Sequence, residues 1–296
     1  MKKVLAIVGP TAVGKTSISI NLAKKFHGEI INGDSVQVYK GLDIGSAKIT
    51  PEEMSLVPHH LLDIKEPGEF FSVAEYQELV RNKINEISER DKLPIIVGGT
   101  AFYIHAALYD FRFIKEEKNI DRDKYANLTD EELHQMLIQI DEKEALKIHP
   151  HNRRRVLRAL QIYENNRMTK SEFLKEHTPK PLYDILIIGL DWDRKKLYER
   201  INQRVDMMLE KGLLKEVEML YHKGIKVDAI GYKEFDDYFL GLISLDEVNE
   251  KIKQNTRHYA KRQLTYFRNK LDVKWFDVEK TDVEDIYNEV SKWLRM

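Results

Sequence analysis

The pattern of hydrophobic and polar residues predicts alternating strands and helices in the first hundred residues of the chain. Val4–Val8 is a continuous aliphatic run, as expected of a parallel strand that is buried on both faces. Ser17–Phe26 follows with apolar residues at helical spacing, and Ser72–Arg90 shows an amphipathic helix that begins with a capping serine. Short apolar runs at 29–32 and 94–97 predict two further strands. This order is typical of an α/β fold with a parallel sheet.

The rest of the chain departs from this alternation and then returns to it. Residues 112–182 are polar, helical in pattern and without a convincing strand, which predicts a helical insertion. The apolar run Ile185–Leu190 predicts a strand that rejoins the first sheet, and an amphipathic helix follows that ends at Gly212. The expected organisation is therefore a core formed by 1–111 and 183–296, interrupted by the insertion.

Composition limits the classes of function. A chain of 296 residues with 42% hydrophobic residues can bury a sizeable core. Lys and Arg number 48 against 49 for Asp and Glu, so a site for a polyanion would need local clustering of basic residues. The absence of cysteine excludes disulfides, thiolate zinc sites and a cysteine nucleophile. No apolar run reaches the roughly 18 residues of a membrane helix, and we expect a cytoplasmic protein.

The strongest chemical motif is GPTAVGKT at 9–16, which matches the phosphate-binding loop G-x-x-x-x-G-K-[ST]. It stands between a predicted strand and a predicted helix, where Gly9 and Gly14 let backbone N–H groups turn toward one anion. Lys15 adds a positive charge, and the Thr16 hydroxyl is a candidate ligand for Mg²⁺. An ordinary glycine turn is the alternative. The motif predicts a phosphate or diphosphate ligand without saying which molecule carries it.

Polar residues follow two of the predicted strands at the edge where open α/β sheets bind ligands. Asp34 follows the second strand, and three roles are open to it: ligand of Mg²⁺, general base, or cap of the next helix. Thr100 follows the third strand after two glycines, which permit a ligand to approach the backbone closely. A helix cap is the alternative there too.

Basic residues cluster in three places, although each cluster also fits an ordinary solvated helix face. Arg154 and Arg158 share one face of a predicted helix. Arg200 and Arg204 repeat at the same spacing, and such a pair could clamp a diphosphate leaving group. The segment 256–268 interleaves basic side chains with aromatic ones, as RNA-binding surfaces do. Three such clusters in a chain of nearly neutral net charge favour an RNA site.

Together these motifs resemble those of the bacterial tRNA dimethylallyltransferases, also called tRNA isopentenyltransferases. The resemblance covers nearly the whole chain and keeps the order of the family's motifs. The matching segments are GPTAVGKT at 9–16, GDSVQVYKGLDIGSAK at 33–48, HHLLDI at 59–64, VGGTAFY at 97–103, HPHNRRRVLRAL at 149–160, DAIGYKE at 228–234 and TRHYAKRQLTYFR at 256–268.

The resemblance implies a P-loop NTPase-like core with a helical insertion, dimethylallyl diphosphate and tRNA as substrates, and Mg²⁺ as cofactor. By motif, Asp34 would be the catalytic base, Thr100 and Arg204 would help to hold substrate and diphosphate, and Thr16 would bind the metal. The diphosphate would be held by Gly9, Pro10, Thr11, Ala12, Val13, Gly14, Lys15 and Thr16. The tRNA would be contacted by Asp34, Ser35, Val36, Gln37, Arg154, Arg155, Val156, Leu157, Arg158, Asp228, Ala229, Ile230, Gly231, Tyr232 and Lys233.

The chemistry that fits is alkylation of N6 of the adenosine 3′-adjacent to the anticodon, with release of diphosphate. That base must be flipped out of the anticodon loop to reach an enclosed centre, and the insertion is expected to grip the anticodon stem. An adenylate isopentenyltransferase acting on AMP and a small-molecule P-loop kinase remain alternatives. A non-enzymatic RNA-binding module would leave Lys15 and Thr16 unexplained. We expect a monomer without a membrane partner.

Overall fold

The computed structural model describes residues 1–113, 123–176 and 179–296. Within these residues the chain forms two compact units. The larger unit comprises 1–109 and 181–296, and the smaller one comprises 110–180. The hydrophobic pattern predicts the insertion at 112–182.

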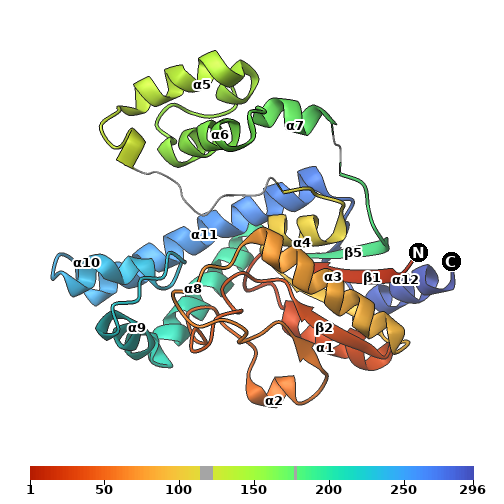
Figure 1. Ribbon diagram of the computed structural model, residues 1–296. Coiled ribbons are helices and arrows are strands. Elements are labelled where there is room, and N and C mark those ends of the chain that lie inside the picture. The colour runs from red at the N-terminus through yellow and green to blue at the C-terminus, as the bar shows by residue number, and fades with distance from the viewer. Residues whose placement is uncertain (114–122, 177–178) are drawn as a thin grey trace. The chain divides into compact units, whose positions relative to one another are not determined.

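The larger unit is built on a six-stranded sheet in the order β3-β2-β4-β1-β5-β6, with every neighbouring pair parallel (Figure 1). The strands are β1 Lys3–Val8, β2 Gly28–Asn32, β3 His59–His60, β4 Leu93–Gly98, β5 Asp184–Asp191 and β6 Lys274–Asp277. The four predicted strands are confirmed as β1, β2, β4 and β5. The two edge strands were missed, because runs of two and four residues are too short to show a period.

Helices cover both faces of this sheet. Along β1, Val4 and Ala6 belong to the hydrophobic cluster that includes residues of α3, α4 and α11, whereas Leu5 and Ile7 belong to the cluster with α1 and α12. The sheet is therefore buried on both sides, which explains its unbroken apolar strands. The helices of this unit are α1 Lys15–Lys25, α2 Pro51–Met54, α3 Val73–Glu89, α4 Ala101–Leu108, α8 Arg194–Glu210, α9 Leu213–His222, the 3₁₀ helix Lys233–Phe235, α10 Asp236–Phe239, α11 Leu245–Lys270 and α12 Val283–Arg295.

Local signals set the ends of several helices. The Ser72 hydroxyl accepts a hydrogen bond from the N–H of Glu75 at 3.1 Å, which confirms the predicted cap of α3. Helix α8 ends just before Gly212, whose φ of 99° suits glycine. The two chain termini lie side by side (Figure 1), where the Lys3 ammonium donates to the carbonyl oxygen of Trp293 at 2.7 Å.

Within its described residues, the regular elements of the smaller unit are all helices. Its elements are the 3₁₀ helix Asp123–Tyr125, α5 Asp130–Ala145, α6 Arg153–Asn166 and α7 Lys170–Glu176. Leu133 and Leu137 of α5 pack with Val156 and Leu160 of α6 in a hydrophobic cluster of its own. Arg153 joins the start of α6 to the chain before α5, because its guanidinium donates to two carbonyl oxygens there, at 2.6 and 2.7 Å.

Candidate functional site

The segment Gly9–Thr16 forms the turn after β1 and the first two residues of α1, as its motif predicts. Gly9 has a φ of 147°, and a Cβ there would stand 2.5 Å from the carbonyl oxygen of Leu190, so no other residue fits without a shift. The Lys15 ammonium donates to the carbonyl oxygens of Gly9 at 3.0 Å and Pro10 at 2.8 Å. The lysine is therefore folded back onto its own loop, where its charge faces any anion bound in the turn.

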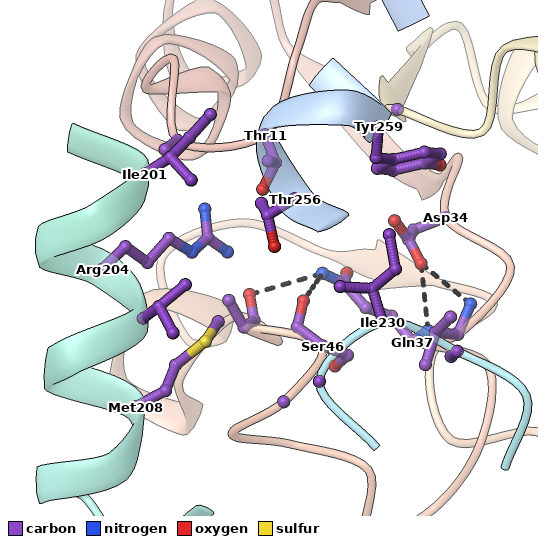
Figure 2. A pocket seen from close by; sticks show the side chains of 18 of the residues that line it. Thr11, Asp34, Gln37, Ser46, Ile201, Arg204, Met208, Ile230, Thr256 and Tyr259 are labelled. Carbon is purple, nitrogen blue, oxygen red and sulfur yellow. Dashed lines mark hydrogen bonds between the residues drawn. The ribbon is translucent and has the colours of Figure 1, made fainter. Parts of the chain in front are cut away.

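Asp34 lies just beyond the carboxyl end of β2. The neighbouring strand ends approach closely, because a Cβ on Gly98 would stand 2.1 Å from the carbonyl oxygen of Gly33. Oδ1 of Asp34 accepts hydrogen bonds from the N–H groups of Val36 at 2.8 Å and Gln37 at 3.4 Å (Figure 2). The chain continues in turns, so a role in capping the next helix is wrong. Among the described residues none hydrogen-bonds to Oδ2, which leaves that oxygen available to a ligand.

Thr100 occupies the position before α4, but its side chain makes no capping hydrogen bond. Its hydroxyl oxygen instead accepts from the N–H of Ser35 at 3.0 Å and donates to the Ser35 hydroxyl at 3.3 Å. Thr100 therefore ties the end of β4 to the segment that carries Asp34. It is not among the residues that line the cavity described below.

Three charged side chains from distant parts of the sequence influence one another at this edge of the sheet. Burial and the Arg204 charge lower the pKa of Lys15 to about 7, while the Asp34 carboxylate opposes that shift. Burial also lowers the pKa of Arg204, and the Asp34 carboxylate again opposes that shift. The site therefore holds two partly desolvated cations and one carboxylate, which favours binding of an anion with more than one charge.

These groups line one cavity of about 630 Å³. Figure 2 shows Arg204 reaching from α8 into it, with Asp34 and Tyr259 on another side. Residues of the phosphate loop, of the turns after β2 and β4, of α8 and of α11 form its wall together with two further loop segments. The candidate residues that line it are Thr11, Ala12, Val13, Gly14, Lys15, Thr16, Asp34, Ser35, Val36, Gln37, Arg200, Arg204, Asp228, Ala229, Ile230, Gly231 and Lys233.

Helix α11 connects the phosphate loop to the end of β4. Buried Gln263 accepts from the N–H of Thr11 at 3.1 Å and donates to the carbonyl oxygen of Gly99 at 2.9 Å. One turn earlier, burial and the nearby Asp34 charge raise the pKa of Tyr259 to about 12, so its hydroxyl stays protonated. Gln263 was not among the site residues predicted from the sequence. A polar residue four positions from Tyr259 and four from a buried phenylalanine was the available signal.

The two arginines proposed as a clamp play different parts. Arg204 lines the cavity with its side chain. Arg200 donates from Nε to the carbonyl oxygen of Ala12 at 3.0 Å, and its guanidinium lies 4.8 Å from the ring centre of Trp192. Arg200 therefore braces the phosphate loop. It also lines the cavity, so the expected clamp by both arginines stays a prediction.

The basic and aromatic segment 256–268 is largely used within the fold. Phe267 is fully buried, and the Tyr266 hydroxyl hydrogen-bonds to Nδ1 of His105 at 3.0 Å. Arg268 forms an ion pair with Asp191. These three side chains serve the fold, as expected of a helix that buries one face. Tyr259 and Arg262 of the same segment line the cavity, so the expected contact of this segment with RNA stays a prediction.

Two loop segments form the wall opposite the phosphate loop. The Gln37 side-chain amide donates to the carbonyl oxygens of Ser46 at 3.1 Å and Ala47 at 3.3 Å (Figure 2). Residues 228–231 pass beside this segment and also line the cavity. The Tyr232 side chain does not, because it is buried and its hydroxyl donates to Glu216 at 2.8 Å. Its side chain is thus unavailable to RNA in the folded chain, contrary to expectation.

The candidate residues 154–158 lie on α6 of the smaller unit. Arg154 and Arg155 are exposed, and Leu157 and Arg158 are partly exposed. Val156 is fully buried in the core of that unit, so its side chain cannot meet RNA in the folded state. A helix that buries every third or fourth residue exposes only part of such a segment.

Among the described residues no group of three or more His, Cys, Asp or Glu side chains could hold a metal ion. The exposed Thr16 hydroxyl at the start of α1 is the remaining protein ligand that the motif offers. Mg²⁺ usually takes one or two protein ligands and completes its shell with phosphate oxygens and water, so this sparse set fits it. In the described part of the chain no helix is both long and apolar enough to cross a membrane.

The parallel sheet, with a glycine loop leading from a central strand into a helix, defines the larger unit as a P-loop NTPase-like fold. Comparison with known proteins narrows this class. The family model described as IPP transferase matches residues 37–270. A tRNA dimethylallyltransferase of Anoxybacillus flavithermus is 52% identical over 99% of this chain and 96% of that relative. The one from Bacillus subtilis is 53% identical over 93% and 90%.

The chain belongs to the IPP transferase family, which confirms the resemblance seen in its motifs. Solved structures agree. A full-length tRNA isopentenylpyrophosphate transferase from Bacillus halodurans is 46% identical and superposes with a TM-score of 0.76 over 100% of this chain and 97% of that one. A eukaryotic dimethylallyltransferase solved acting on tRNA is 31% identical, with a TM-score of 0.84 over 99% of this chain and 79% of that one.

Proposed function

We propose that this protein transfers the dimethylallyl group of dimethylallyl diphosphate to N6 of the adenosine 3′-adjacent to the anticodon of tRNA. The observation that carries this proposal is a shared cavity in which Lys15 and Arg204 face Asp34. Cations for a leaving anion and a carboxylate for an entering amine are what an alkyl transfer from a diphosphate needs. The family membership supports the same reaction.

The phosphate loop would bind the leaving group. Negative charge grows on the bridging oxygen as its bond to C1 of the dimethylallyl group breaks, and preorganised donors stabilise this change. Lys15 and the N-terminal end of α1 would hold the diphosphate from the loop, and Arg204 would approach it from α8. Burial makes both charges more effective, since less water screens them.

Asp34 would act on the acceptor. The adenine amino group is a poor nucleophile because its lone pair is delocalised into the ring. As N6 attacks C1, the N–C bond forms, the C–O bond to diphosphate breaks, and Oδ2 of Asp34 accepts one N6 proton. Oδ1 is held by the N–H groups of Val36 and Gln37, which orient the carboxylate while leaving the other oxygen available.

Mg²⁺ is the cofactor we propose, with Thr16 as its protein ligand. When bound, the ion would neutralise part of the charge on the leaving diphosphate. The residues of the chain would still orient both substrates. Thr11 is fixed by Gln263, so the loop is already shaped before a ligand arrives.

We further propose that the helical insertion, 112–182, contacts the anticodon stem, with Arg154, Arg155 and Arg158 as phosphate contacts. Residues Ser35 to Gln37 and the cavity-lining part of 228–233 would meet the flipped adenosine. We expect the protein to act as a monomer in the cytoplasm, where its tRNA substrates are.

The proposal is tested with purified protein, Mg²⁺ and dimethylallyl diphosphate labelled in the alkyl group. We expect label to enter unmodified tRNA and not AMP. Label in AMP alone would identify an adenylate isopentenyltransferase. Transfer of the γ-phosphate of ATP to a small molecule, with no alkyl transfer, would identify a kinase and overturn the proposal.

Replacing Asp34 by Asn tests the base directly. The amide oxygen can still accept from Val36 and Gln37, so the turn survives while the proton acceptor is lost. We expect kcat to fall by about 10²-fold or more, with tRNA affinity nearly unchanged. Asp237→Asn, at an exposed ion pair on α10, is the control and should keep full activity. Turnover near the wild-type rate in Asp34→Asn would exclude this role.

A further inference from the structure

Glu216 of α9 is a buried carboxylate that the reaction itself does not use. It lies on the inner side of its helix with only 6% of its surface exposed. Its Oε2 accepts from the N–H groups of Asp43 at 3.1 Å and Ile44 at 2.7 Å. Its Oε1 accepts from the N–H of Gly45 at 3.0 Å and from the Tyr232 hydroxyl at 2.8 Å. Four donors thus converge on one side chain.

Among the described residues no Lys, Arg or His forms an ion pair with Glu216. Three successive backbone N–H groups take the place of a cation, as they do in anion-binding turns. A buried carboxylate is strongly unfavourable unless such donors surround it. Burial and the Glu216 charge also raise the pKa of Tyr232, so its hydroxyl remains a donor. The carboxylate and the turn therefore stabilise each other.

The segment that Glu216 holds leads directly into the cavity. Gly45, Ser46 and Ala47 line it, and the carbonyl oxygens of Ser46 and Ala47 accept from the Gln37 side chain. Figure 2 shows this contact next to the one that joins Gln37 to Asp34. The N–H of Gln37 is one of the two donors to Oδ1 of Asp34. A continuous series of hydrogen bonds therefore runs from Glu216 to the proposed base.

Glu216 also joins two loops that are distant in sequence. Tyr232 packs against the 43–47 segment so tightly that a Cβ on Gly45 would stand 2.6 Å from its ring. A Cβ on Gly231 would stand 3.2 Å from the carbonyl oxygen of Gly45. Both loops line the cavity, and Glu216 hydrogen-bonds to both. The phosphate loop is braced separately, by Gln263 and Arg200.

We propose that Glu216 is a positioning residue for the acceptor: its buried carboxylate fixes the 43–47 and 228–232 segments, and through them Gln37 and Asp34. The proposal rests on the proposed function, in which these segments receive the adenosine. It assigns Glu216 to the tRNA side of the reaction and leaves the diphosphate side to other residues.

The test is Glu216→Gln, assayed with each substrate varied in turn. The amide keeps the shape of the side chain but directs an NH₂ group at two donors. We expect kcat/KM for tRNA to fall by about tenfold or more, while KM for dimethylallyl diphosphate changes less than about twofold. A general loss of structure would move both parameters together, so the split separates positioning from folding.

Two further variants make the test specific. Glu29→Gln removes another buried carboxylate, which holds His60 and Arg90 near the start of β2, and it should not change the ratio of the two KM values. Gln37→Leu should lower kcat/KM for tRNA. In the double variant Gln37→Leu with Glu216→Gln, kcat/KM for tRNA should fall by clearly less than the product of the two single fold-changes. Full multiplicativity would show that Glu216 does not act through Gln37, and would overturn the proposal.

If Glu216→Gln does not fold, Tyr232→Phe removes a single donor and should lower kcat/KM for tRNA by a smaller factor. An unchanged kcat/KM for tRNA in the folded variant overturns the inference, as does an equal rise in KM for both substrates. The wild-type protein tests the proposed function itself, because failure of that function would appear without any substitution. If the wild-type protein alkylates tRNA normally, a negative result with the variants counts only against the role of Glu216.

Discussion

The two sides of the cavity are built by different means. The phosphate side follows directly from a regular sheet: a strand, a glycine turn and a helix in immediate succession, with Lys15 bound to carbonyl oxygens five and six residues away. The opposite side consists of turns without a regular element, and the 43–45 backbone depends on a carboxylate more than 170 residues later. One side is local in sequence, and the other depends on long-range contacts.

This difference matches the ligands proposed for each side. A diphosphate is small and symmetric, so converging N–H groups and one lysine can recognise it. A flipped nucleobase in a tRNA has a specific outline and needs a shaped wall, which several loops can provide together. Variants on the two sides should therefore affect different substrates, and that separation can be measured.

Lys15→Ala should have the largest effect, because it removes the charge at the phosphate loop. We expect kcat/KM for dimethylallyl diphosphate to fall by about 10² to 10³-fold, while direct binding of tRNA in the absence of the diphosphate stays near the wild-type value. Filter binding or fluorescence anisotropy with labelled tRNA measures the second quantity. Lys24→Ala, exposed later on the same helix, is the control. A large loss of tRNA binding in Lys15→Ala would show that the two sides are not separate.

The same contrast explains what the sequence could predict. The phosphate loop, the four longer strands and the cap of α3 follow from neighbouring residues, and their predictions are confirmed. Gln263 and Glu216 could not be found in this way, because each acts on backbone groups that only the fold brings near. The sequence also could not separate two uses of α11, because Phe267 is buried in the core while Tyr259 and Arg262 line the cavity.

Gln263→Leu should have the next largest effect. Leucine is of similar size but leaves the N–H of Thr11 and the carbonyl oxygen of Gly99 without their partner. Such losses cost about 1 to 3 kcal/mol each, so we expect KM for dimethylallyl diphosphate to rise about tenfold or more, with KM for tRNA less affected. Gln254→Leu, on the exposed part of the same helix, should leave both constants unchanged. If only KM for tRNA changed, Gln263 would act on the acceptor side of the cavity and not on the phosphate side.

Gly45→Ala probes the opposite wall. The added Cβ would stand 2.6 Å from the Tyr232 ring, and overpacking of this kind costs about 1 to 3 kcal/mol. Partial relaxation of the loops should reduce this to an increase of about tenfold or less in KM for tRNA, with KM for the diphosphate unchanged. Gly45→Val should increase the effect. If neither variant alters KM for tRNA, the 43–47 segment does not shape the acceptor site.

The smallest effect should be a pH dependence that belongs to the phosphate side alone. Burial and Arg204 lower the pKa of Lys15 to about 7 in the free protein, and a bound diphosphate favours the charged lysine, so binding raises that pKa. Affinity for dimethylallyl diphosphate should therefore have its full value below pH 7, where Lys15 is protonated. Above pH 7 the affinity should fall by at most about tenfold per pH unit. The last ionisation of the ligand lies at roughly 6, so a titration between pH 7 and 9 reports on the protein.

Calorimetry in buffers of different ionisation enthalpy would detect the proton taken up, and Lys15→Arg, which stays charged, should abolish the dependence. A similar slope in tRNA binding would assign the titration to another group and remove this distinction between the two sides.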